Sequence, residues 1–122
     1  MATEIINANR PLTEDESKLI RWMLEHGKPE ARRLLDQLDR AQVTPGACPC
    51  GCASIDLSID GQVPPKGGLT PIADFVFTRD AEEYGAFVFE IDGMLAGLEV
   101  FGLSGDAPKF LPESFELKPW TW

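Results

Sequence analysis

A chain of 122 residues is long enough to bury a hydrophobic core as one domain without disulfide or metal staples. Hydrophobic residues make up 43% of it and charged residues 25%, a composition that is typical of globular proteins and excludes a disordered chain. The 20 acidic and 11 basic side chains give a net charge of −9, which disfavours binding to nucleic acid or to an anionic membrane. We therefore expect one acidic domain, residues 1–122, with no nucleic-acid and no membrane partner.

The N-terminus does not suggest export. Residues 1–4 lack the basic and then apolar layout of a signal peptide, and no apolar run approaches the roughly 20 residues of a membrane-spanning helix. All three cysteines lie within five residues, so they cannot form a disulfide framework between distant segments. Reduced thiols and a cytoplasmic location are the expectation.

The N-terminal third predicts an antiparallel helical hairpin at about residues 13–42. Thr13 and Glu16 have the spacing of a capping box, Gly27 suits a helix end, and Pro29 suits the first turn of a second helix. Apolar residues then recur at helical spacing on one side of each segment. They are Leu19, Ile20, Met23 and Leu24 in the first helix, and Ala31, Leu34, Leu35 and Leu38 in the second.

From about residue 53 to residue 101 the pattern becomes that of a β-sheet. Ile55, Leu57 and Ile59 alternate with polar residues, which predicts a strand with one buried face. Three further strands are expected at about 72–78, 86–91 and 94–101.

The connections between these strands differ in character. Asp92–Gly93 predicts a type I′ hairpin turn, because Asp and Gly accept the positive φ that this turn requires. The polar residues 79–85 predict a longer connection. Residues 61–71 hold three prolines and three glycines around Lys66, which is typical of a flexible or ligand-binding loop. Residues 102–122 form an apolar tail.

The predicted fold class is α+β, with the helical hairpin packed on one face of a four-stranded, mainly antiparallel β-meander. Short connections favour sequential strands as neighbours in such a sheet. We expect the apolar stripes of the two helices to meet Ile55, Leu57, Phe87 and Phe89.

Cys48, Cys50 and Cys52 are the candidate metal ligands. In an extended segment they would project to one face, where three thiolates suit zinc or another soft metal. Structural zinc takes four ligands, usually from paired C-x-x-C or His motifs, so His26, Asp56 or a carboxylate from the acidic loop would have to supply the fourth. C-x-C-x-C alone is a weak zinc signature.

Two other interpretations of the cysteine-rich turn, residues 44–53, stay open. A reversible disulfide would need a low-pKa thiol beside positive charge, yet no basic residue lies between Arg40 and Lys66. Free cysteine is also among the most buried residue types, so the thiols can simply line a tight turn between the helices and the sheet.

No catalytic motif is found in the sequence. It has no G-x-G-x-x-G, P-loop, H-E-x-x-H or G-x-S-x-G pattern, and His26 fits a helix end better than a catalytic role. The sequence therefore assigns no catalytic residue and no cofactor, with zinc as the alternative.

Three stretches carry a resemblance to a known group of proteins. Ala41–Val43, Cys50–Leu57 and Leu95–Phe101 resemble a family of small uncharacterised bacterial proteins with a helical hairpin, a C-x-C-G-C-x-[ST] segment and a β-meander. The resemblance covers roughly Thr13 to Phe101. It implies a bacterial cytoplasmic domain and transfers no catalytic residue.

The acidic charge, the Pro/Gly loop and the lack of a catalytic motif favour a non-enzymatic interaction module that recognises a basic protein partner. The alternative is a metal-binding or thiol-redox protein that uses the cysteine cluster. A homodimer, formed through a free edge strand or through Trp120 and Trp122, is left open.

Overall fold

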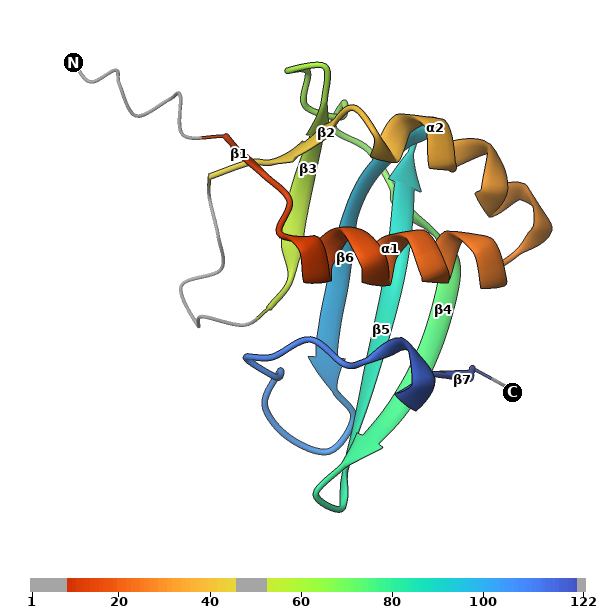
Figure 1. The fold of residues 1–122 in the computed structure, drawn as a ribbon, viewed down its shortest axis with the longest axis vertical. Coiled ribbons are helices and arrows are strands. Elements are labelled where there is room, and N and C mark those ends of the chain that lie inside the picture. Colours follow the sequence, from red (N-terminus) through yellow and green to blue (C-terminus); the bar gives the residue numbers. More distant parts are fainter. Residues whose placement is uncertain (1–8, 46–52, 121–122) are drawn as a thin grey trace.

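The computed structural model describes residues 9–45 and 53–120. It is an α+β fold in which a seven-stranded antiparallel sheet carries its helices on one face (Figure 1). In chain order the elements are β1 (Arg10–Pro11), α1 (Glu14–His26), the 3₁₀ segment η2 (Pro29–Leu34), α2 (Leu35–Leu38), β2 (Ala41–Val43), β3 (Ile55–Ile59), β4 (Thr70–Arg79), β5 (Glu82–Ile91), β6 (Met94–Gly102), η3 (Ser114–Glu116) and β7 (Lys118–Pro119).

Helix α1 begins at the predicted capping box. The Thr13 side chain accepts a hydrogen bond from the Glu16 backbone N–H (3.1 Å), and the Glu16 carboxylate accepts one from the Thr13 backbone N–H (2.9 Å). The same carboxylate, which is buried, also accepts two hydrogen bonds of 2.9 Å from Arg10. The ion pair thus ties β1 to the start of the helix. At the other end, Nδ1 of His26 donates to the carbonyl of Trp22 (2.8 Å), which fits the predicted helix-end role.

The predicted second helix is largely replaced by other structure. Residues Pro29–Leu34 form a 3₁₀ segment, and only Leu35–Leu38 are α-helical. The buried residues Ala31 and Leu34 are three apart, and a 3₁₀ segment places residues i and i+3 on the same side. The chain is already extended at Ala41–Val43, which overlaps the end of the range expected to be helical, and the helical hairpin is not confirmed.

The order of the strands corrects the expected sequential meander. The sheet runs β1-β2-β3-β6-β5-β4-β7, so β4, β5 and β6 form a meander but β3 pairs with β6 and not with β4. The chain between β3 and β4 therefore has to pass two strands, a distance of about 14 Å at the usual strand spacing. Residues 60–69 reach that far easily, because an extended residue spans about 3.3 Å. We call this segment the crossing loop.

Two tight turns connect the central strands. Asp92 and Gly93 both have positive φ, 53° and 79°, as the predicted type I′ turn requires. Asp80 and Ala81 also have positive φ, 53° and 65°, and they join β4 directly to β5. The long connection predicted at residues 79–85 is wrong, because Asp and Ala here adopt a conformation that the sequence pattern does not favour.

The core lies between the sheet and the helical layer, where α1 crosses in front of β5 and β6 in Figure 1. Leu57 is fully buried and Leu35 is half-buried against this core, as expected. Phe87 and Phe89 do not belong to it. Ala86 and Val88 occupy the helix side of β5, together with buried apolar residues from the other elements: Leu19, Ile20, Met23, Leu24, Leu34, Ile72, Phe75, Phe77, Leu98 and Val100.

Both edges of the sheet are very short strands. β1 pairs with β2 only at Arg10 and Pro11, and β7 pairs with β4 only at Lys118 and Pro119. The backbone N–H of Lys28 covers another position of the β4 edge by donating to the carbonyl of Ile72 (2.9 Å). No helix in the described part of the chain has both the length and the apolar character needed to cross a bilayer.

Candidate functional site

The face of the sheet opposite α1, which we call the far face, carries a row of aromatic rings. Phe87 lies 5.8 Å from Phe89 and 5.9 Å from Phe101, measured between ring centroids, and Phe101 lies 6.4 Å from Trp120. Phe89 is buried, and the other three rings are half-buried. The side of the sheet that lacks helices is therefore apolar across its central strands.

Two glycines make room for these rings. A Cβ added at Gly97 would lie 2.6 Å from Cζ of Phe89, and one at Gly85 would lie 2.3 Å from Cζ of Phe101. Phe89 is paired with Gly97, and Phe101 with Gly85, so each ring lies over the neighbouring strand. This arrangement of an aromatic ring over a cross-strand glycine is a known way of filling the gap that glycine leaves in a sheet.

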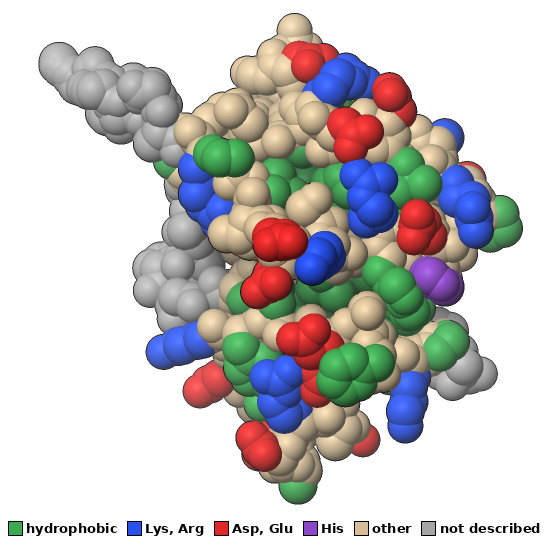
Figure 2. Space-filling model, viewed as in Figure 1, with side chains coloured by type: hydrophobic (Ala, Val, Ile, Leu, Met, Phe, Trp, Pro, Cys, Tyr) green, Lys and Arg blue, Asp and Glu red, His purple; other side chains and the backbone are tan. Residues whose placement is uncertain are grey.

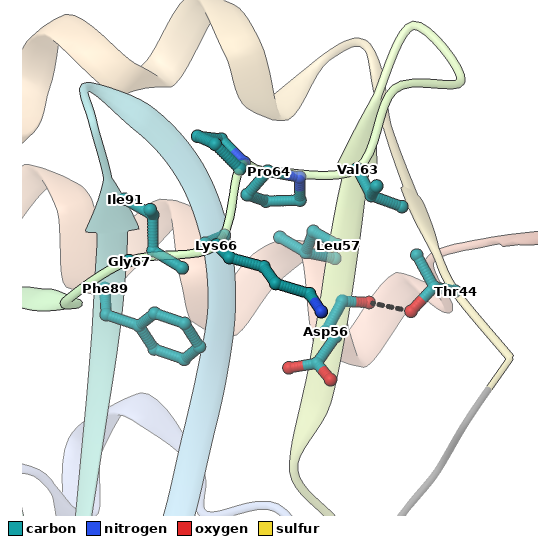
Figure 3. A pocket seen from close by; sticks show the side chains of 11 residues that line it. Thr44, Asp56, Leu57, Val63, Pro64, Lys66, Gly67, Phe89 and Ile91 are labelled. Carbon is teal, nitrogen blue, oxygen red and sulfur yellow. Dashed lines mark hydrogen bonds between the residues drawn. The ribbon is translucent and has the colours of Figure 1, made fainter.

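The crossing loop converts one end of the far face into a cleft. It passes over β6 and β5 on this side and borders an open volume of about 500 Å³ (Figure 3). That is within the range of small-ligand and side-chain pockets, roughly 300–1,000 Å³. The strands contribute Asp56, Leu57, Phe89, Ile91 and Ala96, Thr44 lies at one side, and the loop contributes Val63, Pro64, Pro65, Lys66 and Gly67.

Two carboxylates are brought together beside the aromatic row. Asp56 on β3 lies opposite Gly97 on β6, and Glu99 is two residues further along β6, so both belong to the far face. Such diagonal positions are about 7–8 Å apart at their backbones, within reach of long side chains. The pKa of Glu99 is raised above its ordinary value because burial and the charge of Asp56 disfavour its ionised form, although a hydrogen bond from Ser54 acts in the opposite direction.

Most arginines of the protein are engaged away from this pair. Five of the six, Arg10, Arg21, Arg33, Arg40 and Arg79, form ion pairs with carboxylates elsewhere. Acidic and basic side chains accordingly alternate over the helix-covered side in Figure 2. Within residues 9–45 and 53–120, neither Asp56 nor Glu99 forms an ion pair.

Among the described residues that line the cleft, the one cation comes from the crossing loop. Lys66 is an exposed residue, and Figure 3 shows its side chain extended across the cleft toward Asp56. No ion pair or hydrogen bond joins Lys66 to Asp56 in the described structure. The ammonium group thus points toward Asp56 without being fixed to it.

No protein family, curated protein or solved structure matches this chain. The candidate site consequently rests on its geometry alone.

The cysteines that the sequence singled out, Cys48, Cys50 and Cys52, lie outside the described residues. The zinc and redox hypotheses, and the family resemblance that includes this segment, stay predictions. The described part of the chain contains no group of three or more His, Cys, Asp or Glu side chains placed to hold a metal. His26 is stacked on Trp22, with 4.1 Å between the ring centroids, and Asp56 belongs to the cleft.

A second hollow, of about 370 Å³, opens at the β4 edge of the sheet. It is lined by Lys28, Asp74 and Trp120 among others. Burial raises the pKa of Asp74, and the charge of Lys28 partly offsets this. Because Asp74 pairs with Phe87 across β4 and β5, it adds a third carboxylate to the far face.

Proposed function

We propose that this protein is a non-enzymatic binding module that recognises a basic segment of a partner protein on the far face of its sheet. The observation that carries the proposal is the pair of carboxylates, Asp56 and Glu99, set without arginine partners beside an apolar cleft. A basic segment supplies the matching chemistry, because its lysine or arginine side chains combine a long apolar stem with a cationic head.

Each part of the far face has a role in this proposal. The stems of incoming side chains would pack on Phe89 and Ile91, which line the cleft. Their cationic heads would meet Asp56 and Glu99, and the rings of Phe87 and Phe101 offer faces for cation–π contact, worth about 0.5–2 kcal/mol each. An incoming cation would also relieve the repulsion between the two carboxylates. The net charge of −9 would speed the approach of such a partner.

Peptide binding tests the proposal. A short lysine-containing peptide, labelled for fluorescence anisotropy, should bind the native protein, and its affinity should fall as salt rises from about 50 to about 300 mM, because exposed charges are screened beyond about 10 Å at 0.1 M. A peptide with glutamate in place of lysine should not bind.

Two matched variants locate the site. Glu99→Gln and Glu83→Gln both remove one negative charge, but Glu83 is exposed at the opposite end of β5 from the cleft. We expect Glu99→Gln to weaken binding at least about tenfold, the loss of one charged hydrogen-bonding partner. Glu83→Gln should change it by less than about twofold, the effect of a screened surface charge. Equal effects of the two variants would show that the acid pair beside the cleft is not the site, and no binding of the basic peptide at any salt would refute the proposal.

A further inference from the structure

We infer that the cleft accepts one lysine side chain from the partner and that Lys66 is its built-in occupant, which the partner's lysine displaces. This inference rests on the proposed function and adds the identity of the recognised side chain and a means by which access to the site is regulated. The observation behind it is the position of Lys66, whose side chain spans the cleft and points toward Asp56 (Figure 3).

The position of Lys66 shows what the cleft accommodates. Its aliphatic stem shares the cleft with Pro64, Phe89 and Ile91, and its ammonium end lies on the Asp56 side (Figure 3). A lysine from another chain would meet the same apolar walls and the same carboxylate. About 500 Å³ is open beside Lys66, so the stem of a second lysine fits along the same walls, and its ammonium group would compete with that of Lys66 for Asp56.

The crossing loop holds Lys66 weakly. Outside the strand ladders, the backbone hydrogen bonds of the described structure include Ile59 with Gln62 but none from residues 63–69. Val63 is 67% exposed and Leu69 is 47% exposed, so the loop has little packing of its own at either end. Lys66 stands between two prolines and two glycines. The prolines restrict the backbone before Lys66, and the glycines allow the backbone after it to change conformation.

Displacement has a simple thermodynamic consequence. When a site is occupied part of the time by a group of the protein itself, the apparent affinity for a ligand falls by the fraction of time for which the site is open. Removing Lys66 should therefore strengthen the binding of a lysine-containing peptide. If Lys66 instead held a ligand in the cleft, its removal would weaken binding.

The test compares Lys66→Ala with Lys109→Ala. Both variants remove one positive charge, so the change in the net charge of the protein is the same. Lys109 serves as the control because it is exposed in the segment between β6 and η3, outside the cleft. We expect Lys66→Ala to raise the affinity for the lysine peptide about threefold or more, while Lys109→Ala raises it by less than about 1.5-fold. A peptide with norleucine in place of lysine, which keeps the stem and lacks the charge, should bind neither variant.

A second measurement follows Lys66 directly. In protein whose lysines carry ¹³C-methyl groups, the Lys66 resonance should be shifted from that of Lys109 by the nearby Phe89 ring. Adding the lysine peptide should return the Lys66 resonance to the position of Lys109, since the side chain leaves the cleft.

The outcomes separate the two proposals. If the lysine peptide binds but Lys66→Ala leaves its affinity unchanged or lowers it, the built-in occupant is refuted and the binding module stands. If the lysine peptide binds neither the native protein nor Lys66→Ala, both proposals fail.

Discussion

Gly97→Ala should destabilise the sheet where the aromatic row meets β3. The added methyl group would lie 2.6 Å from Cζ of Phe89 and 2.7 Å from the carbonyl oxygen of Ile55, whereas an ordinary contact begins at 3.4 Å. Relief therefore requires movements of about 0.7–0.8 Å in a buried ring on one side and in the backbone of the paired strand on the other. Overpacking of this kind costs about 1–3 kcal/mol.

Urea unfolding, followed by tryptophan fluorescence, measures this cost. With a slope of about 1–3 kcal/mol per molar urea, a loss of about 2 kcal/mol lowers the midpoint by roughly 1 M. The control is Gly68→Ala in the crossing loop, where an added Cβ meets nothing within 4 Å. This control should be neutral or stabilising by up to about 1 kcal/mol, because alanine restricts the unfolded chain. If Gly97→Ala unfolds at the same urea concentration as Gly68→Ala, the close packing of Phe89 over Gly97 is wrong.

Three further predictions concern charge and metal. The pKa of Glu99 is raised in the folded protein, so its ionised form destabilises the fold as the pH rises above 4.5, the ordinary pKa of the group. Glu99→Gln should therefore raise the melting temperature at pH 7 and not at pH 4. An equal gain at both pH values would contradict this. The hydrogen bonds from Arg10 lower the pKa of Glu16, so the ion pair stabilises the fold above pH 4.5 and is lost as the pH falls below that value. Glu16→Gln should lower the free energy of unfolding by about 1–3 kcal/mol at pH 7 and by progressively less in acid. Urea unfolding at each pH measures this difference. The zinc hypothesis concerns Cys48, Cys50 and Cys52. If these residues bind zinc, elemental analysis should find about one equivalent of metal, which a chelator removes with the release of reactive thiols. Metal-free protein would end that hypothesis.

Three local signals in the sequence predicted the local structure correctly, whereas the apolar spacing at residues 29–42 did not. The capping box of Thr13 and Glu16, the alternation of Ile55, Leu57 and Ile59, and the turn at Asp92–Gly93 depend only on neighbouring residues. The order of the strands depends on more than that. The crossing loop is long enough either to connect neighbouring strands or to pass two of them, so its length does not reveal that β3 pairs with β6.

The orientation of β5 was missed for a related reason. Alternation shows that Phe87 and Phe89 share one face and that Ala86 and Val88 share the other, but it does not show which face meets the helices. Size and hydrophobicity favour the phenylalanines for the core, yet the small residues fit beneath α1. Gly97 and Gly85 indicate the orientation of β5, since each leaves space for an aromatic ring on the face of the sheet opposite α1.

The acid pair could not be found from the sequence because its members are distant in the chain. The sequence offers Asp56 as a candidate fourth metal ligand and gives no reason to single out Glu99. The pairing of β3 with β6 brings them together. Lys66 was noticed within its loop, but its relation to Asp56 follows from the path of that loop across the sheet.

The two edges of the sheet share a composition that affects how this protein meets other chains. Each ends in a basic residue followed by proline, Arg10–Pro11 on one side and Lys118–Pro119 on the other. Proline offers no N–H to a further strand, and a charged side chain at the rim opposes the stacking of one sheet on the next, two devices that guard against fibril-like growth. The two edge strands therefore disfavour self-association by strand addition in a protein whose sheet has an apolar far face.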